Sequence, residues 1–198
     1  MVRLIPRTIP VKEILRKSLH FIAGIIIVAI GLIAQKKAEI DQIKMVMMAL
    51  MLTLIALDYL RIEYNLKIPI YSLFIRSKES NKLSAGVSLL LAGIICLTFY
   101  DYAIALAAIS MHIFGDAVAA LMGKSFGSTK IFKRKTVLGT ASALVINIVV
   151  GAIILKSAYI MIAMALISTI LEMIVEKLDD NFIVPIFTGL VGQAIKYI

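Results

Sequence analysis

Long apolar segments separated by short polar connections form the dominant pattern of this chain. Each segment approaches the ~20 residues that an α-helix needs to cross the hydrocarbon core of a bilayer, and most carry almost no charge. The pattern therefore predicts about seven membrane-spanning helices. Their approximate bounds are 18–34, 43–60, 84–100, 102–122, 137–155, 158–175 and 182–198.

The connections between these segments predict how the helices are arranged. Spans three and four meet at Asp101 alone, and spans five and six turn around Lys156, so each pair should form an antiparallel hairpin. No small-residue cleavage site cleanly follows the first span, which favours an anchor helix over a removed signal peptide. Without an internal repeat or linker, residues 1–198 are expected to form one all-α integral-membrane domain, a polytopic helix bundle.

Composition agrees with a membrane protein and excludes several other classes. The chain is 61% hydrophobic over 198 residues, which leaves too little polar surface for a soluble domain of this size. Its formal charge of +9 is concentrated in short connections between apolar segments, where topology and anionic headgroups account for it better than nucleic acid does. With Cys96 as the single cysteine, no disulfide or CxxC metal site can form within the chain.

The distribution of basic residues predicts an orientation. With seven spans and a cytoplasmic N-terminus, 16 of the 21 lysines and arginines fall on the cytoplasmic side and the C-terminus lies outside. This orientation gathers most of the ionisable residues of the spans near the cytoplasmic face. We therefore expect the functional site there, in the cell membrane of a prokaryote.

Ionisable residues inside the predicted spans are candidates for function, because each costs roughly 2.5 to 3.5 kcal/mol to insert unless it is paired or hydrated. His112 and Asp116 are four residues apart and share a helix face with Gly115. That face also fits a simple packing stripe of small residues. Asp58 is three residues from Arg61, a spacing that equally suits a local ion pair.

A basic connection follows His112 and Asp116. Gly123-Lys124 and Gly127 predict a turn whose backbone N–H groups face an anion, just before a helix that begins near Thr136. Its remaining cations are Lys130, Lys133, Arg134 and Lys135. Phosphate suits such a connection, although membrane topology alone also predicts basic residues here.

Acidic residues on the same side complete the candidate site. Glu172 and the Asp179-Asp180 pair should face the basic connection, together with Asp116. Carboxylates beside bound phosphates suit Mg²⁺, which proteins hold through one or two carboxylates plus substrate oxygens. Two histidines and one cysteine on separate spans give little support for zinc.

These residues carry a resemblance to a known family. The stretch resembles the signature of the dolichol kinase, phytol kinase and CTP-dependent diacylglycerol kinase family, which is related to the phosphatidate cytidylyltransferases. The matching positions are Gly115-Asp116-Ala117, Ala119-Ala120, Gly123, Gly127, Lys135-Thr136 and Gly139-Thr140, with Glu13, Arg16-Lys17, His20, the polar segment 76–83, Glu172, Asp180-Asn181 and Pro185 outside the stretch. Leu138 departs from the pattern, because the family commonly has glutamate there.

The resemblance implies transfer of the γ-phosphoryl group of CTP to the hydroxyl of a membrane lipid alcohol: a polyprenol such as dolichol, phytol or geranylgeraniol, or diacylglycerol. Asp116 would bind Mg²⁺ with help from Glu172 or Asp180, and Asp58 or His112 would accept the hydroxyl proton. The nucleotide would contact Gly115, Gly123, Lys124, Gly127, Lys133, Arg134, Lys135, Thr136 and Gly139.

Two alternative functions remain open from the sequence. A phosphatidate cytidylyltransferase has a similar pattern, but the proline usual before its paired lysines is absent from Phe132-Lys133-Arg134-Lys135-Thr136. A transporter or non-catalytic scaffold is the alternative of a different class. Transporters more often show internal repeats and polar groups at the midplane, whereas this chain shows no repeat and gathers its polar groups on one side.

Overall fold

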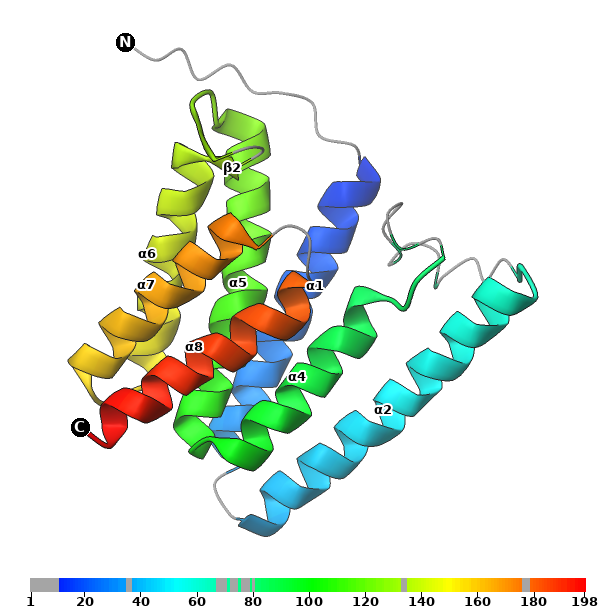
Figure 1. Cartoon of the computed structure of the whole chain (residues 1–198), viewed down its shortest axis with the longest axis horizontal. Helices are drawn as coiled ribbons and strands as arrows, with labels where there is room; N and C mark the ends of the chain where they lie inside the picture. Colours follow the sequence, from blue (N-terminus) through cyan, green and yellow to red (C-terminus); the bar gives the residue numbers. More distant parts are fainter. Residues whose placement is uncertain are drawn as a thin grey trace.

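A computed structural model describes residues 11–34, 37–66, 71, 75, 79, 81–132, 135–175 and 179–198. These residues form seven α-helices and one short β-hairpin (Figure 1). The helices are α1 (Val11–Ile33), α2 (Lys37–Glu63), α4 (Ala85–Phe99), α5 (Tyr102–Phe126), α6 (Val137–Ile154), α7 (Ala158–Ile174) and α8 (Asp180–Lys196). The protein is therefore all-α apart from the hairpin, and every predicted span coincides with a helix.

Four of these helices, α1, α2, α5 and α6, contain stretches long and apolar enough to cross a membrane. The apolar helices α4 and α7 are shorter. Many large apolar side chains on the outer faces are exposed, such as Ile25 and Ile26 of α1 and Leu52 of α2. Exposed apolar surface on several neighbouring helices is expected where lipid replaces water as the solvent.

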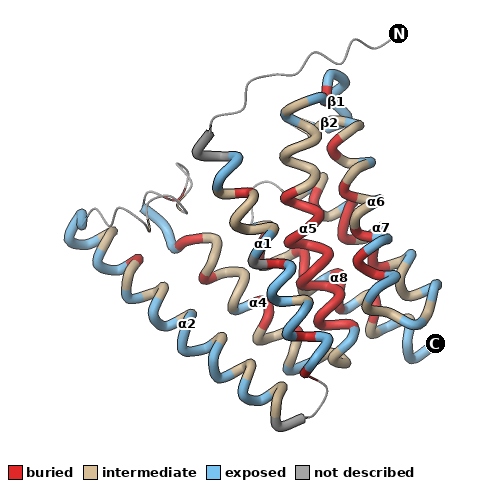
Figure 2. The backbone as a smooth tube through the Cα atoms, turned by 180° about the vertical axis from the view of Figure 1, so that it is seen from behind, coloured by how far each residue is buried: buried red, intermediate tan, exposed pale blue. Residues whose placement is uncertain are grey.

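Helix α5 lies at the centre of the bundle. It packs against α1, α4, α6, α7 and α8, and 78% of its apolar stretch is buried, compared with 6% for α2 (Figure 2). Small side chains make this possible, because Ala105, Ala107 and Ala108 let neighbouring helices approach the α5 backbone closely. Helix α2 stands at the edge and packs chiefly against α4.

The connection between α5 and α6 differs from the prediction. Helix α5 continues to Phe126, so Gly123 and Lys124 belong to its last turn and only Gly127, its C-cap, begins the connection. The expected turn at Gly123-Lys124 was therefore wrong. The connection then forms two antiparallel strands, β1 (Lys130–Phe132) and β2 (Lys135–Thr136), which the apolar pattern did not predict because they are short and exposed or half-buried.

Candidate functional site

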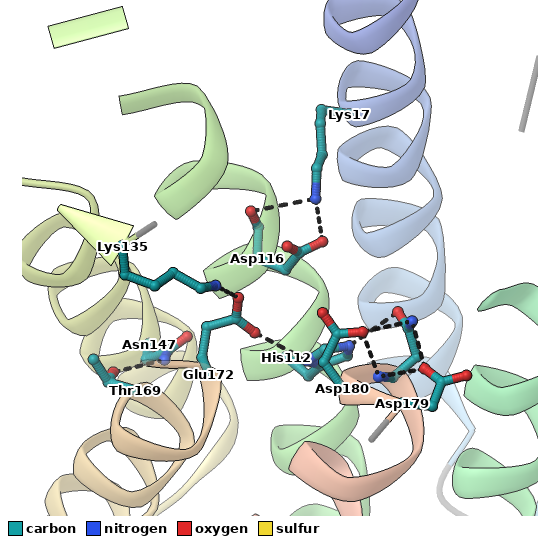
Figure 3. A network of polar contacts seen from close by, with 10 residues as sticks. Lys17, His112, Asp116, Lys135, Asn147, Thr169, Glu172, Asp179 and Asp180 are labelled. Atoms are coloured by element: carbon teal, nitrogen blue, oxygen red, sulfur yellow. Dashed lines mark hydrogen bonds and ion pairs between the residues drawn. The ribbon is translucent and has the colours of Figure 1, made fainter. Parts of the chain in front are cut away.

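Three carboxylates from three helices meet at one end of the bundle. Asp116 comes from α5, Glu172 from α7 and Asp180 from the first turn of α8 (Figure 3). One oxygen of each lies within 4.8 Å of the others. Asp116 and Glu172 are buried and Asp180 is half-buried. Like charges this close repel one another strongly, so the cluster requires nearby cations.

Two lysines supply positive charge directly. Lys17 of α1 is buried, and its ammonium forms an ion pair with Oδ2 of Asp116. Lys135 of β2 donates from Nζ to Oε1 of Glu172 over 2.5 Å. Burial acts to lower the pKa of Lys135, but the Glu172 carboxylate, with Asp116 and Asp180 nearby, outweighs it and holds the pKa above its ordinary value. Lys135 is therefore fully charged at neutral pH.

A cavity of about 510 Å³ opens beside the carboxylate cluster. Its wall contains all three carboxylates together with the cations Arg16, Lys17, Lys124 and Lys135. Thus four cations face three carboxylates. A divalent cation bound to the carboxylates would leave an excess of positive charge in the wall, which suits an anion with several negative charges such as a polyphosphate.

Close packing of α5 against α6 shapes one side of this cavity. A Cβ atom at Gly139 would lie 2.8 Å from the carbonyl oxygen of Ala119 and 3.1 Å from Cα of Gly123. Both are backbone atoms, so no side-chain rotation could relieve the contact. Glycine here lets the two helices touch, and it brings the start of α6 to the cavity wall. Thr136 caps that start by accepting a hydrogen bond from the Gly139 N–H at 3.2 Å.

A buried polar pair lies below the carboxylates. His112 and Asn181 are each 1% exposed, and Nε2 of His112 lies 3.2 Å from Oδ1 of Asn181. On its other side, Nδ1 of His112 lies 3.7 Å from Oε2 of Glu172, and neither of these two atoms has a hydrogen-bond partner among the described residues. His112 therefore contacts the Glu172 carboxylate but is not part of the cavity wall.

Asp58 belongs to a different cluster. It is fully buried at the end of α2, where Oδ1 pairs with the Arg61 guanidinium at 2.9 Å and Oδ2 accepts from the Ser84 N–H at 2.7 Å. Arg61 also donates to the carbonyl oxygens of Glu79 and Lys82. These contacts join the end of α2 to the start of α4. The local ion pair is thus present, and the structure does not bring Asp58 to the cavity.

The remaining candidate positions divide into three groups. Gly123, Lys124, Lys135, Thr136 and Gly139 all line the cavity. Gly115 instead lies against Asn147, and Gly127 packs against Thr136 and the Gly123 carbonyl, so both glycines serve helix packing. Lys133 and Arg134 lie outside the described residues.

Sequence reasoning did not assign a role to several residues of the site. Lys17 and Arg16 were noted only within a motif, and nothing along the sequence indicated that Lys17 pairs with a residue 99 positions away. Asn181 was likewise noted beside Asp180 without a role. One signal was available, because Lys17 and Asn181 are polar residues at the ends of apolar spans, where buried polar groups require partners.

The donor set of the carboxylate cluster fits a divalent metal ion. Three carboxylates provide hard oxygen ligands of the kind that Mg²⁺ prefers, and Oε2 of Glu172 is buried without a hydrogen-bond partner in the part of the chain that the structure describes. Comparison with known protein families, with curated proteins and with solved structures finds no match for this chain.

Proposed function

We propose that the protein is a CTP-dependent lipid kinase, which transfers the γ-phosphoryl group of CTP to the hydroxyl group of a membrane lipid alcohol. The acceptor would be a polyprenol, phytol or geranylgeraniol, or diacylglycerol. The observation that carries the proposal is the union of three carboxylates and four cations in one cavity, at the end of helices apolar enough to cross a membrane. The choice of CTP rests on the resemblance in sequence.

The cavity residues divide into two roles. Asp116, Glu172 and Asp180 hold Mg²⁺, which neutralises charge on the phosphates. Arg16, Lys17, Lys124 and Lys135 bind the phosphate oxygens, assisted by the N-terminus of α6. The lipid hydroxyl oxygen bonds to the γ-phosphorus as the bond to the β-phosphate oxygen breaks, and CDP leaves. The hydroxyl proton passes to an oxygen of the transferred phosphoryl group, because the three carboxylates of the cavity wall hold the metal.

A second cavity suits the hydrocarbon tail of the acceptor. It has a volume of about 650 Å³ and lies between α1, α2, α4 and α5, with an almost wholly apolar wall. The two cavities share α1 and α5, and the ten residues from Lys17 to Ile27 correspond to about 15 Å along α1. A long-chain acceptor with its hydroxyl at the carboxylates has the reach to fill the apolar cavity.

We further propose that all seven helices cross the membrane, with a cytoplasmic N-terminus and an external C-terminus. The basic residues near the carboxylate cavity then lie on the cytoplasmic side, where nucleotide is available. The bias of lysine and arginine between the two sides supports this orientation.

Labelled CTP tests the proposed reaction. Purified protein in lipid micelles, given CTP labelled separately at the α and γ positions with Mg²⁺, should transfer the γ label alone to the lipid fraction. Transfer of the α label would instead indicate a cytidylyltransferase, and label from γ-ATP with equal efficiency would refute the choice of CTP. Mass analysis of the product identifies the acceptor.

Asp116→Asn tests the central residue. It removes a metal ligand of the proposed site, so the rate should fall by about 100-fold or more. The variant should retain the wild-type helix content by circular dichroism. Full activity of a folded Asp116→Asn protein would refute the assignment of the site.

A further inference from the structure

His112 and Asn181 connect two of the three carboxylates without entering the cavity. Both side chains are almost fully buried, at the level where α5, α7 and α8 meet. Their polar atoms therefore have no water to interact with and are restricted to neighbouring protein groups. The contacts of His112 and Asn181 therefore indicate their role.

The surroundings of Asn181 fix the orientation of its amide. Nδ2 donates to Oδ1 of Asp179 at 2.9 Å and to Oδ1 of Asp180 at 3.1 Å. The opposite orientation would place the amide oxygen against two carboxylates, so Oδ1 must face His112. Because Oδ1 can only accept, Nε2 of His112 is the donor in the 3.2 Å contact.

His112 then packs its other ring nitrogen against Glu172, a contact that is too long for a hydrogen bond and that limits where the carboxylate can turn. Nδ1 lies 3.7 Å from Oε2 of Glu172, whereas Lys135 contacts the other oxygen, Oε1, at 2.5 Å. The chain of contacts runs from Asp180 through Asn181 and His112 to Glu172 (Figure 3). It joins carboxylates that are eight residues apart and belong to separate helices, α7 and α8.

We propose that His112 and Asn181 are positioning residues, which set the separation and orientation of the Glu172 and Asp180 carboxylates for the divalent cation. This inference rests on the proposed function, because it assumes that these carboxylates bind metal. Without the buried pair, Asp180 and Glu172 would lose these contacts, and repulsion between the two like charges would move the carboxylates apart. Partners of this kind, which orient metal ligands without touching the metal, typically contribute 10–100-fold in metal affinity.

Binding of Mn²⁺ provides a test that does not depend on catalysis. Mn²⁺ prefers the same oxygen ligands as Mg²⁺ and can be titrated by electron paramagnetic resonance with purified protein in detergent. His112→Leu and Asn181→Leu should each weaken binding about 10-fold or more. His112→Gln should retain part of the affinity, because its amide can still donate toward Asn181.

The control is Ser110→Ala, two residues from His112 on α5. Ser110 is fully buried, and its hydroxyl donates to the carbonyl oxygen of Leu106 within the same helix. This variant should bind Mn²⁺ as the wild type does. In activity assays, His112→Leu should raise the Mg²⁺ concentration needed for half-maximal rate, and saturating Mg²⁺ should restore the KM for CTP.

Two results would overturn the inference, and they are distinguishable. Wild-type affinity in folded His112→Leu and Asn181→Leu, alongside a loss of binding in Asp116→Asn, would refute the positioning role and leave the metal site intact. A wild-type protein that does not bind Mn²⁺ would refute the metal site and the positioning role together. If either leucine variant fails to fold, wild-type metal binding with no shift in Mg²⁺ dependence in His112→Gln would still refute the role of His112.

Discussion

Three carboxylates that are almost fully buried each lie against a cation. Asp58 pairs with Arg61, Asp116 with Lys17, and Glu172 with Lys135. A buried charge without a partner costs several kcal/mol, so each pair is a condition for folding. The pairs differ in what surrounds them. The two that involve Asp116 and Glu172 border a cavity, whereas Asp58 accepts hydrogen bonds from Arg61 of its own helix and from the Ser84 N–H at the start of α4.

The contrast predicts that Asp58 acts on stability and not on the reaction. Asp58→Asn should lower the free energy of unfolding by about 3 kcal/mol, because the largely buried Arg61 guanidinium loses its carboxylate partner. Asp41→Asn on the same helix is the control, since Asp41 and Lys44 form a more exposed pair worth no more than ~1 kcal/mol. Denaturant unfolding measures both. Activity per folded Asp58→Asn molecule should match wild type, and a loss of 100-fold would restore Asp58 as a candidate base.

The hydroxyl of Tyr71 supports the same cluster. It lies 3.1 Å from Oγ of Ser84, the residue whose backbone N–H reaches Asp58. Burial raises the pKa of Tyr71 to about 12, and the nearby Asp58 carboxylate acts in the same direction. The hydroxyl therefore stays protonated and able to donate across the physiological range. The cluster around Asp58 thus connects the end of α2 to the start of α4.

At the scale of elements, the contact between α5 and α6 decides the shape of the carboxylate cavity. Gly123 and Gly139 face each other there, and a Cβ atom added at Gly139 would lie closer to the α5 backbone than ordinary van der Waals contact allows. Small residues at such a crossing let helices pack by van der Waals contact where lipid offers no hydrophobic driving force. This close packing of α5 against α6 also brings the start of α6 and Asp116 into the wall of the same cavity.

Gly139→Ala should therefore damage both packing and the site. Its Cβ would meet backbone atoms at 2.8 and 3.1 Å, which forces α5 and α6 apart at a cost of about 1–3 kcal/mol. Gly86→Ala in α4 is the matched control, because its Cβ would meet only flexible side-chain ends, the closest being Cδ1 of Leu54 at 3.0 Å. Thermal unfolding should show a loss for the first variant alone. Equal melting temperatures for the two variants would contradict this account of the contact between α5 and α6.

Helix α2 offers a separate test at the apolar cavity. Leu50 and Leu52 are both exposed on α2, but Leu50 lines the cavity and Leu52 does not. Leu50→Trp should fill part of the cavity and raise the KM for a long-chain acceptor several-fold, since tail contacts are lost, without affecting a short-chain acceptor. Leu52→Trp should change neither value. The same effect from both tryptophans would argue against the apolar cavity as the site of the tail.

The helices could be predicted from the sequence, because hydropathy and the length of a bilayer crossing act locally. The hairpins at Asp101 and Lys156 followed from short connections in the same way. The extension of α5 to Phe126 could not be predicted, since glycine usually weakens a helix end and here it packs against α6 instead.

The candidate site was predictable in its residue types and not in its contacts. Asp116, Glu172 and Asp180 could be grouped because the predicted orientation put them on one side. The pairing of Lys17 with Asp116 depends on how α1 packs against α5, which no local pattern encodes. The position of Asp58 was ambiguous for the same reason, as its spacing from Arg61 fits an ion pair and its burial depends on Ser84.

Over the whole molecule, the carboxylate cavity and the apolar cavity lie toward opposite ends of the same helices. Arg16 and Lys17 of α1 line the carboxylate cavity, and Ile27, Ile30 and Ile33 of the same helix line the apolar one. Helix α5 repeats the division, with Asp116 and Lys124 toward one end and Tyr102 to Ile109 toward the other. A molecule that is polar at one end and a hydrocarbon at the other matches this layout.

Site-directed labelling tests the proposed orientation of the whole chain. Ser128 and Lys156 are exposed at opposite ends of α6, which is about 27 Å long. In intact cells, a membrane-impermeant maleimide should label Lys156→Cys, and it should label Ser128→Cys only after permeabilisation. Cys96 is buried, so the native background should be low. The reverse labelling pattern would refute a cytoplasmic nucleotide site.

The burial of α5 has a consequence for how the chain is made. This helix carries His112 and Asp116, is the most buried of the four candidate spans, and precedes α7 and α8 along the chain. If it crosses a membrane as proposed, it enters the bilayer before those two helices exist to surround it. Lys17, which pairs with Asp116 in the folded protein, lies on α1 and is already synthesised at that point. The order of the helices along the chain would thus supply a counter-ion in time for insertion. In cell-free synthesis with membranes, Lys17→Met should lengthen the time for which α5 can be crosslinked to the translocon.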